Sequence, residues 1–62
     1  MRKLAYTVAE AAVVASVEMA TIVRAIQDGA LRARRVEDDM RVLDADIAAW
    51  LDACPEWPTL LG

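Results

Sequence analysis

The sequence predicts a small, mainly α-helical fold in which a two-stranded hairpin lies between the second and the third of three helices. Three observations predict it: a capping-box motif opens the first helix, apolar residues recur at helical spacing in three segments, and an acidic turn separates two short strand-like segments. A chain of 62 residues has room for one small domain. We place that domain at residues 1–54 and treat residues 55–62 as an apolar C-terminal tail.

The first helix is predicted to begin at Val8. Thr7 and Glu10 have the S/T-x-x-E spacing of a capping box, in which each side chain accepts a hydrogen bond from an otherwise unpaired backbone amide at the helix start. Small apolar residues then follow i, i+3, i+4, i+7 spacing at Val8, Ala11, Ala12 and Ala15. Such a narrow face lets a second helix approach closely.

A second helix of about nine or ten residues is predicted between a turn at residues 16–18 and Gly29. Helices often end with a residue in the left-handed conformation, which glycine adopts readily because it has no Cβ atom, and Gly29 lies at such a position. Val17 is the expected apolar plug between the two helices. One face of the second helix is apolar and carries Ile22, Ala25 and Ile26. The two helices and their turn therefore predict a helix-turn-helix unit.

The hairpin is predicted from residues 31–36 and 40–43, which are short segments with apolar residues at their ends. Glu37, Asp38 and Asp39 lie between them and suit a tight turn. Because an isolated two-stranded hairpin is only marginally stable in water, we expect this one to pack against the helices.

The third helix is predicted to follow the hairpin directly. Asp44 is the expected N-cap, and Asp46 complements the positive end of the helix. Its apolar face has i, i+3, i+4 spacing and carries Ile47, Trp50 and Leu51. We expect Trp50 to be the largest buried side chain. Pro55 should end the helix because proline lacks the amide that continues the backbone hydrogen bonds.

The tail after Pro55 is unusually apolar for an end segment. Trp57, Leu60 and Leu61 are its candidates for contact with another protein, because exposed apolar clusters usually mean interaction. The same residues would equally suit a tail that folds back over the small core. Both interpretations stay open.

The composition argues against an enzyme and against a metal site. Histidine is absent and Cys54 is the single cysteine, so zinc ligands and histidine-assisted nucleophiles are lacking. There is no glycine-rich nucleotide loop either. We therefore expect no catalytic residue, no metal and no cofactor. No apolar run approaches the ~20 residues that a membrane span needs, and we expect a soluble, cytoplasmic protein.

The charge is distributed unevenly. The net charge of −3 and the pI of about 4.6 would by themselves disfavour nucleic acid as a partner. Residues 1–36, however, hold six basic and three acidic side chains, whereas residues 37–62 hold one basic and seven acidic side chains. The basic part is the one that carries the helix-turn-helix unit.

Several segments follow the register of a known family. These segments lie at the start of the first helix, in the turn, along the second helix, in the hairpin and in the third helix. In that order they are Thr7-Val8-Ala9-Glu10-Ala11-Ala12, Val17, residues 21–31, Arg35-Val36 with Arg41-Val42, and Ile47-Ala48-Ala49-Trp50-Leu51. Over this ungapped register the chain resembles the small winged helix-turn-helix DNA-binding domains of the phage excisionase type, relatives of MerR-type N-terminal domains. The resemblance implies that the hairpin is the wing.

The resemblance implies an architectural factor, also called a recombination directionality factor. Several copies would bind double-stranded attachment-site DNA side by side, bend it and bias a phage integrase toward excision. The second helix would enter the major groove and the wing would lie on the adjacent backbone or minor groove. The implied recognition-helix residues are Met19, Ala20, Thr21, Val23, Arg24 and Gln27. The implied wing residues are Arg32, Arg34, Arg35 and Arg41.

Two segments depart from the family's pattern. Glu18, Met19 and Ala20 stand where the family has a small polar cap, an arginine and a serine, which weakens hydrogen-bonded base recognition. The wing tip is acidic where the family has glycine and basic residues, and phosphate repels carboxylates, so the tip should stay out of the minor groove. Asp38 and Asp39 are instead candidates for contact with a neighbouring copy, in a head-to-tail association along DNA.

The number of arginines that grip phosphate is limited by geometry. Because side chains alternate along a strand, Arg32 and Arg34 would share a face and Arg35 would point away. Four arginine–phosphate contacts for each copy would give a slope of about −3.6 when log K is plotted against log salt.

Other functions fit the same residues. The chain would also suit a small winged-helix transcriptional regulator without an effector domain. It would equally suit a protein-binding module that has lost contact with DNA and binds a partner through its acidic wing and apolar tail. The arginines alone would fit a solvated strand edge whose charges prevent edge-to-edge pairing.

Overall fold

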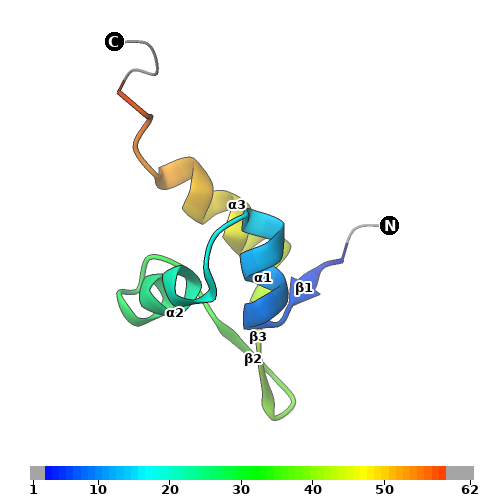
Figure 1. Ribbon diagram of the computed structural model, residues 1–62. Coiled ribbons are helices and arrows are strands. Elements are labelled where there is room, and N and C mark those ends of the chain that lie inside the picture. Colours follow the sequence, from blue (N-terminus) through cyan, green and yellow to red (C-terminus); the bar gives the residue numbers. More distant parts are fainter. Residues whose placement is uncertain (1–2, 59–62) are drawn as a thin grey trace.

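The computed structural model describes residues 3–58, which form three helices and a three-stranded antiparallel sheet. In chain order the elements are β1 (Ala5–Tyr6), α1 (Val8–Ala15), α2 (Met19–Gln27), β2 (Arg34–Val36), β3 (Asp39–Leu43) and α3 (Asp44–Ala53). The β2–β3 hairpin projects from one end of the helices, and the segment after α3 leads away at the other end (Figure 1). The three predicted helices and the predicted hairpin are confirmed.

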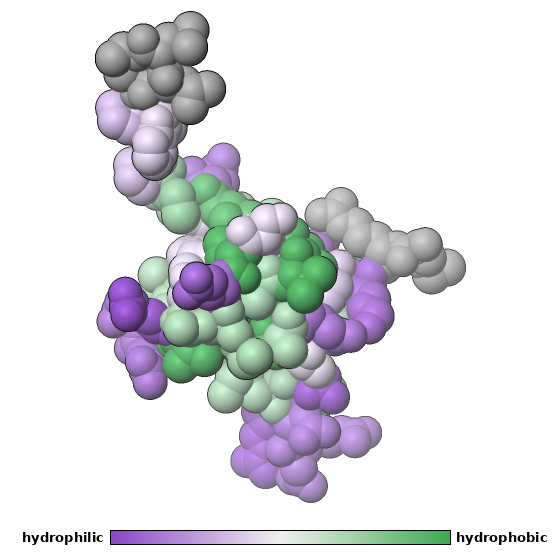
Figure 2. Space-filling view, in the orientation of Figure 1, coloured by the Kyte–Doolittle hydropathy of each residue, from purple (hydrophilic) through white to green (hydrophobic). Residues whose placement is uncertain are grey.

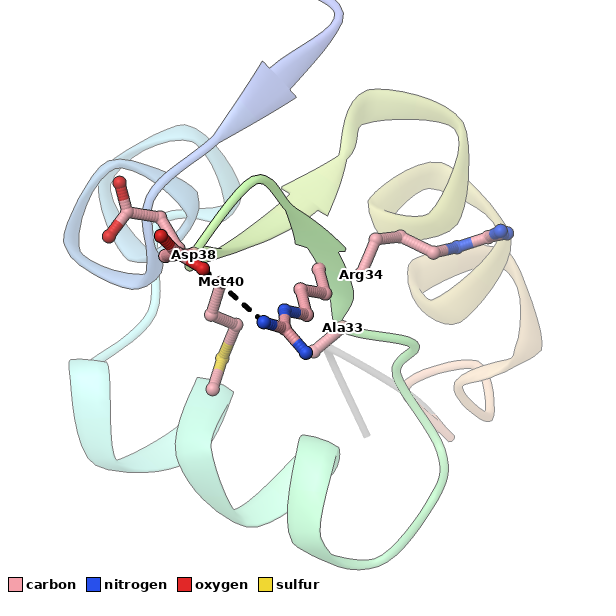
Figure 3. A pocket seen from close by; sticks show the side chains of 6 residues that line it. Ala33, Arg34, Asp38 and Met40 are labelled. Carbon is pink, nitrogen blue, oxygen red and sulfur yellow. Dashed lines mark hydrogen bonds and ion pairs between the residues drawn. The ribbon is translucent and has the colours of Figure 1, made fainter.

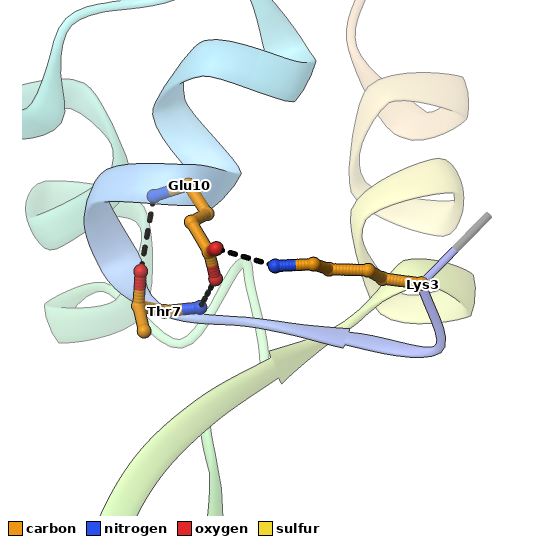
Figure 4. Close-up of polar contacts among 3 residues, drawn as sticks. All are labelled: Lys3, Thr7 and Glu10. Atoms are coloured by element: carbon orange, nitrogen blue, oxygen red, sulfur yellow. Dashed lines mark hydrogen bonds and ion pairs between the residues drawn. The ribbon is translucent and has the colours of Figure 1, made fainter. Parts of the chain in front are cut away.

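The start of α1 is fixed by the predicted capping box. The backbone N–H of Glu10 donates to Thr7 Oγ1 at 3.1 Å, and the backbone N–H of Thr7 donates to Glu10 Oε1 at 2.9 Å (Figure 4). Both amides would otherwise lack a partner in the helix. The helix therefore begins at Val8, as predicted.

Helices α1 and α2 end in the same way. After α1, Ser16 adopts a left-handed conformation with φ 58°, and the N–H of Val17 donates back to Ala12 O at 3.0 Å. After α2, Gly29 has φ 78° and the N–H of Ala30 donates back to Ala25 O at 2.9 Å. Both are Schellman motifs, which pair the last carbonyls of a helix and turn the chain sharply.

The core lies between α1, α2 and β3. Its buried residues are Tyr6, Ala11, Ala12, Ile22, Ala25, Leu31, Val42 and Ile47. Val17 packs against this core from the turn, as predicted. The largest fully buried side chains are Ile22, Leu31 and Val42.

The prediction that Trp50 is the largest buried side chain is wrong. Trp50 is only partly buried, and Leu51 is 42% exposed. Ile47, near the start of α3, is buried, but the helix then runs past the edge of the small core (Figure 1). Helical spacing placed Ile47 and Trp50 correctly on the face of α3 that meets the core, but it was wrong for the exposed Leu51. It also did not give the length over which the core covers the helix.

The sheet has one strand more than the two predicted. Ala5 pairs with Leu43 and Tyr6 with Val42, so β3 is the central strand in the order β1-β3-β2. The N–H of Asp44 extends the pairing by donating to Leu4 O at 2.9 Å. A two-residue strand is too short to show the alternation from which strands are predicted.

The hairpin and the start of α3 also differ from prediction in their boundaries. The turn consists of Glu37 and Asp38, and Asp39 already belongs to β3. The N-cap of α3 is Leu43 and not Asp44. The side chain of Leu43 makes no capping hydrogen bond. The chain passes from β3 into α3 without a loop, so the last strand residue occupies the capping position.

The segment after α3 does not fold back over the core within the described residues. Cys54 has extended dihedral angles, the conformation that the following proline favours, and it is exposed. Trp57 is 77% exposed. Leu60 and Leu61 lie outside the described residues. In the described range, no helix has the length and the apolar content that crossing a membrane requires.

Candidate nucleic-acid interface

The outer face of α2 is the first part of the candidate site. Ile22 and Ala25 are buried and fix the rotation of the helix about its axis. The opposite side presents an i, i+3, i+4, i+7 stripe made of Ala20, Val23, Arg24 and Gln27, all exposed. We call these four residues the outer stripe.

Met19 and Thr21 are also exposed, and they lie at the two margins of the outer stripe. All six residues that were implied for a recognition helix therefore point to the surface of one helix. Arg24 is the single cation of α2 and makes no ion pair with any residue in the range 3–58.

The arginines of the hairpin are arranged differently, because each is paired with a carboxylate. Arg34 Nε lies 3.2 Å from Asp46 Oδ2, and Arg35 Nη2 lies 3.3 Å from Asp38 Oδ1. Arg41 Nη2 lies 3.6 Å from Asp39 Oδ2. Two of these arginines also donate hydrogen bonds to backbone carbonyls. Arg35 Nε donates to Glu37 O at 3.0 Å, and Arg41 Nη1 donates to Met40 O at 2.8 Å.

The strand register divides these arginines between two faces. Arg34 lies opposite Arg41 and Arg35 lies opposite Met40, so Arg34 and Arg41 share one face and Arg35 is on the other. Figure 3 shows Arg34 and Met40 leaving the hairpin on opposite sides, around a shallow hollow of about 300 Å³. Like charges directly opposite each other are destabilising, and the carboxylates beside them offset this repulsion.

Arg32 precedes β2, so strand alternation does not extend to it. It is exposed and forms no ion pair within the described part of the chain. Arg24 and Arg32 are thus the arginines that need not give up a carboxylate to meet a phosphate. Sequence reasoning counted four contacts, and the structure leaves two unpaired arginines among residues 3–58.

The tip of the hairpin is strongly hydrophilic. The Asp38 side chain is 96% exposed and the Asp39 side chain is 70% exposed. Figure 2 shows this hydrophilic tip extending beyond an apolar face formed over the helices. The acidic tip therefore lies at the outermost point of the element that was expected to approach DNA.

A second surface, on α1, was missed by sequence reasoning. Lys3, Tyr6, Glu10, Val13 and Val14 line a largely apolar hollow of about 290 Å³. Val13 is 78% exposed. The signal was present, since Val13 and Val14 lie off the alanine face of the first helix, but the strand that brings Tyr6 beside them was not predicted.

Two of the residues that line this apolar hollow, Lys3 and Glu10, form an ion pair. Lys3 Nζ lies 2.6 Å from Glu10 Oε2 (Figure 4). The hydrogen bond from Lys3 and that from the Thr7 backbone lower the pKa of Glu10 from 4.5 to about 2. Glu10 therefore remains ionised while it serves both the helix cap and the lysine.

The described residues bring together no cluster of histidine, cysteine and carboxylate side chains that would hold a metal ion. No protein-family model, curated protein or solved structure matches this chain.

Proposed function

We propose that this chain is a small DNA-binding architectural factor with a winged helix-turn-helix arrangement. In this proposal α2 lies in the major groove and the β2–β3 hairpin is the wing. Following the family resemblance, the protein would be of the excisionase type: several copies would bind attachment-site DNA cooperatively, bend it and bias an integrase toward excision.

The observation that carries the proposal is the outer stripe of α2. One side of the helix is anchored in the core by Ile22 and Ala25, and the other side is exposed along its whole length. A helix held in this way after a short turn can enter the major groove without moving the rest of the domain. Arg24, unpaired within residues 3–58, gives this face the positive charge that phosphates or guanine edges attract.

The ion pairs of the hairpin make the expected binding weak for a single copy. A carboxylate that stays beside an arginine repels phosphate, so we count only Arg24 and Arg32 as phosphate contacts. The expected slope of log K against log salt is then about −1.8, from −0.9 for each phosphate. Weak binding by one copy makes cooperative binding by several copies useful.

A gel shift tests the proposal. DNA from the protein's own genomic neighbourhood is titrated with protein at several salt concentrations, and the site is also placed at different positions in fragments of equal length to detect bending. We expect a shift at micromolar protein, a negative salt slope and position-dependent mobility. A flat salt dependence, or no shift at any salt concentration, contradicts DNA binding.

A second candidate function, binding to another protein, is favoured by the apolar hollow on α1. Val13 and Val14 are exposed there beside Tyr6, and exposed Leu4 lies on the adjoining segment. Contiguous exposed apolar surface commonly marks a protein contact. Co-purification with a partner that survives high salt, lost in Val13→Asp and accompanied by no DNA shift, would favour this function over the first.

A further inference from the structure

The outer stripe of α2 is divided by chemistry along the helix. Its N-terminal half, Ala20 and Val23, offers only methyl groups, and Met19 beside it is 53% exposed. Its C-terminal half, Arg24 and Gln27, offers hydrogen-bonding groups. A recognition helix usually contacts base edges with its N-terminal residues, which here are the apolar ones.

Apolar side chains in the major groove discriminate between bases. Every base pair presents hydrogen-bonding groups there, and thymine alone adds a C5-methyl group. An apolar side chain that covers a base edge without a methyl displaces water from polar groups and replaces none of their hydrogen bonds. The same side chain over a thymine methyl gains apolar contact instead.

The geometry points to a specific form of sequence reading: we propose that Ala20 and Val23, with Met19 at their margin, recognise thymine through its C5-methyl group. Gln27 supplies the hydrogen-bonded part of the readout, for which adenine is the matching base, and Arg24 beside it makes the phosphate contact. This inference rests on the proposed DNA binding and names the feature of DNA that the same helix selects.

Val23 is suited to this task because its shape is fixed. A valine in a helix has one strongly preferred side-chain rotamer, so its methyl groups are held in place before DNA arrives. Val23 is 39% exposed, and the buried Ile22 next to it in the chain fixes the direction of the helix face. Removal of one buried methyl costs about fourfold in affinity, from the transfer free energy of one such group.

The test replaces thymine by deoxyuridine, which keeps every hydrogen-bonding group and removes only the methyl. A preferred site is first selected from random duplexes with the full chain. Each thymine of that site is then replaced singly, and affinity is measured by fluorescence anisotropy at fixed salt. We expect a loss of about fourfold at one or two positions and no change at the others.

Protein variants assign the effect to residues. Val23→Ala should abolish the deoxyuridine penalty at one position, and the near-isosteric Val23→Thr, which exchanges one methyl for a hydroxyl, should reduce it. Gln27→Ala is the matched control, since it lies on the same stripe and should weaken binding while the penalty persists. Circular dichroism verifies that each variant is folded.

The outcomes separate this inference from the proposed function. If the protein binds the selected site with a salt slope but no deoxyuridine substitution weakens it, methyl recognition is wrong and DNA binding stands. If Val23→Ala and Val23→Thr both keep the full penalty, the assignment of the methyl contact to Val23 is wrong and DNA binding stands. If no duplex is bound at all, both proposals are wrong.

Discussion

Arg34 of β2 and Asp46 of α3 form an ion pair, with Nε 3.2 Å from Oδ2, that ties the hairpin to the third helix. The Asp46 side chain is 18% exposed and lies in the first turn of α3, where the helix dipole also favours a carboxylate. The guanidinium of Arg34 is thus already occupied by a group that resembles a phosphate in charge. Its release would add an unpaired cation to the surface that we propose faces DNA.

Asp46→Asn should therefore tighten DNA binding. The neutral amide frees Arg34, and the slope of log K against log salt should become steeper by about 0.9 for one added phosphate contact. The free energy of unfolding should fall by about 1 kcal/mol or less, because the pair is partly solvated. Anisotropy titrations at several salt concentrations measure the slope.

Asp52→Asn is the matched control for this prediction. Asp52 lies exposed on the same helix and forms no ion pair within residues 3–58, yet its replacement changes the net charge equally. Its slope should equal that of the unmodified protein. An equal change in both variants would assign the effect to overall charge and not to the ion pair.

The double variant Asp38→Lys and Asp39→Lys tests the head-to-tail association. It releases Arg35 and Arg41 and adds two cations, so a single copy should bind DNA more tightly. If the acidic tip contacts the basic part of the next copy, cooperativity should fall at the same time. The Hill coefficient on DNA carrying several sites measures this, and tighter binding with unchanged cooperativity contradicts the association.

Two residues other than glycine adopt a left-handed backbone conformation, and replacing each by glycine should increase the stability of the fold. Ser16 and Glu37 both have φ 58°, a conformation that costs an L-residue about 1–2 kcal/mol. Ser16→Gly and Glu37→Gly should each raise the free energy of unfolding by about 0.5–1 kcal/mol, since the greater freedom of glycine in the unfolded chain offsets part of that cost. Urea unfolding gives the values.

Gly29→Ala provides the opposite case. Gly29 has φ 78°, and a Cβ added there would meet no atom within 4 Å. The expected loss of about 1 kcal/mol is then conformational and not steric. A stabilising effect of Gly29→Ala, or a destabilising effect of both glycine substitutions, would contradict the left-handed assignments.

The contribution of the capping box to the stability of the fold should decrease at low pH. The pKa of Glu10 is lowered to about 2 in the folded state, so its contribution is fully present above its ordinary value of 4.5 and is lost as the pH falls toward 2. Unfolding measured between pH 5 and pH 2 should show a steeper loss of stability for the unmodified protein than for Glu10→Gln. Parallel curves would contradict the lowered pKa.

Local sequence signals were sufficient for the elements whose causes are local. The Thr7–Glu10 capping box and the glycine at position 29 set the ends of helices within a residue or two, because the groups that they satisfy are neighbours in the chain. The exposed positions of α2 followed from the apolar face that contains Ile22. None of these depends on distant parts of the fold.

Features that depend on distant partners were not predictable in this way. Strand β1 exists because Tyr6 meets Val42, which is far along the chain. The neutralisation of Arg34 depends on Asp46, which lies on a different element. Trp50 was placed on the correct face of its helix, but its burial depends on how far the core extends.

Cys54 follows the last residue of α3, is exposed with an extended backbone, and carries the single thiol of the chain. A maleimide dye can therefore be attached there without any other substitution. The dye would stand at the far end of α3, where the chain leads away from α2 and from the hairpin (Figure 1). Energy transfer between donor- and acceptor-labelled copies mixed on one DNA fragment would then report directly how neighbouring copies are spaced.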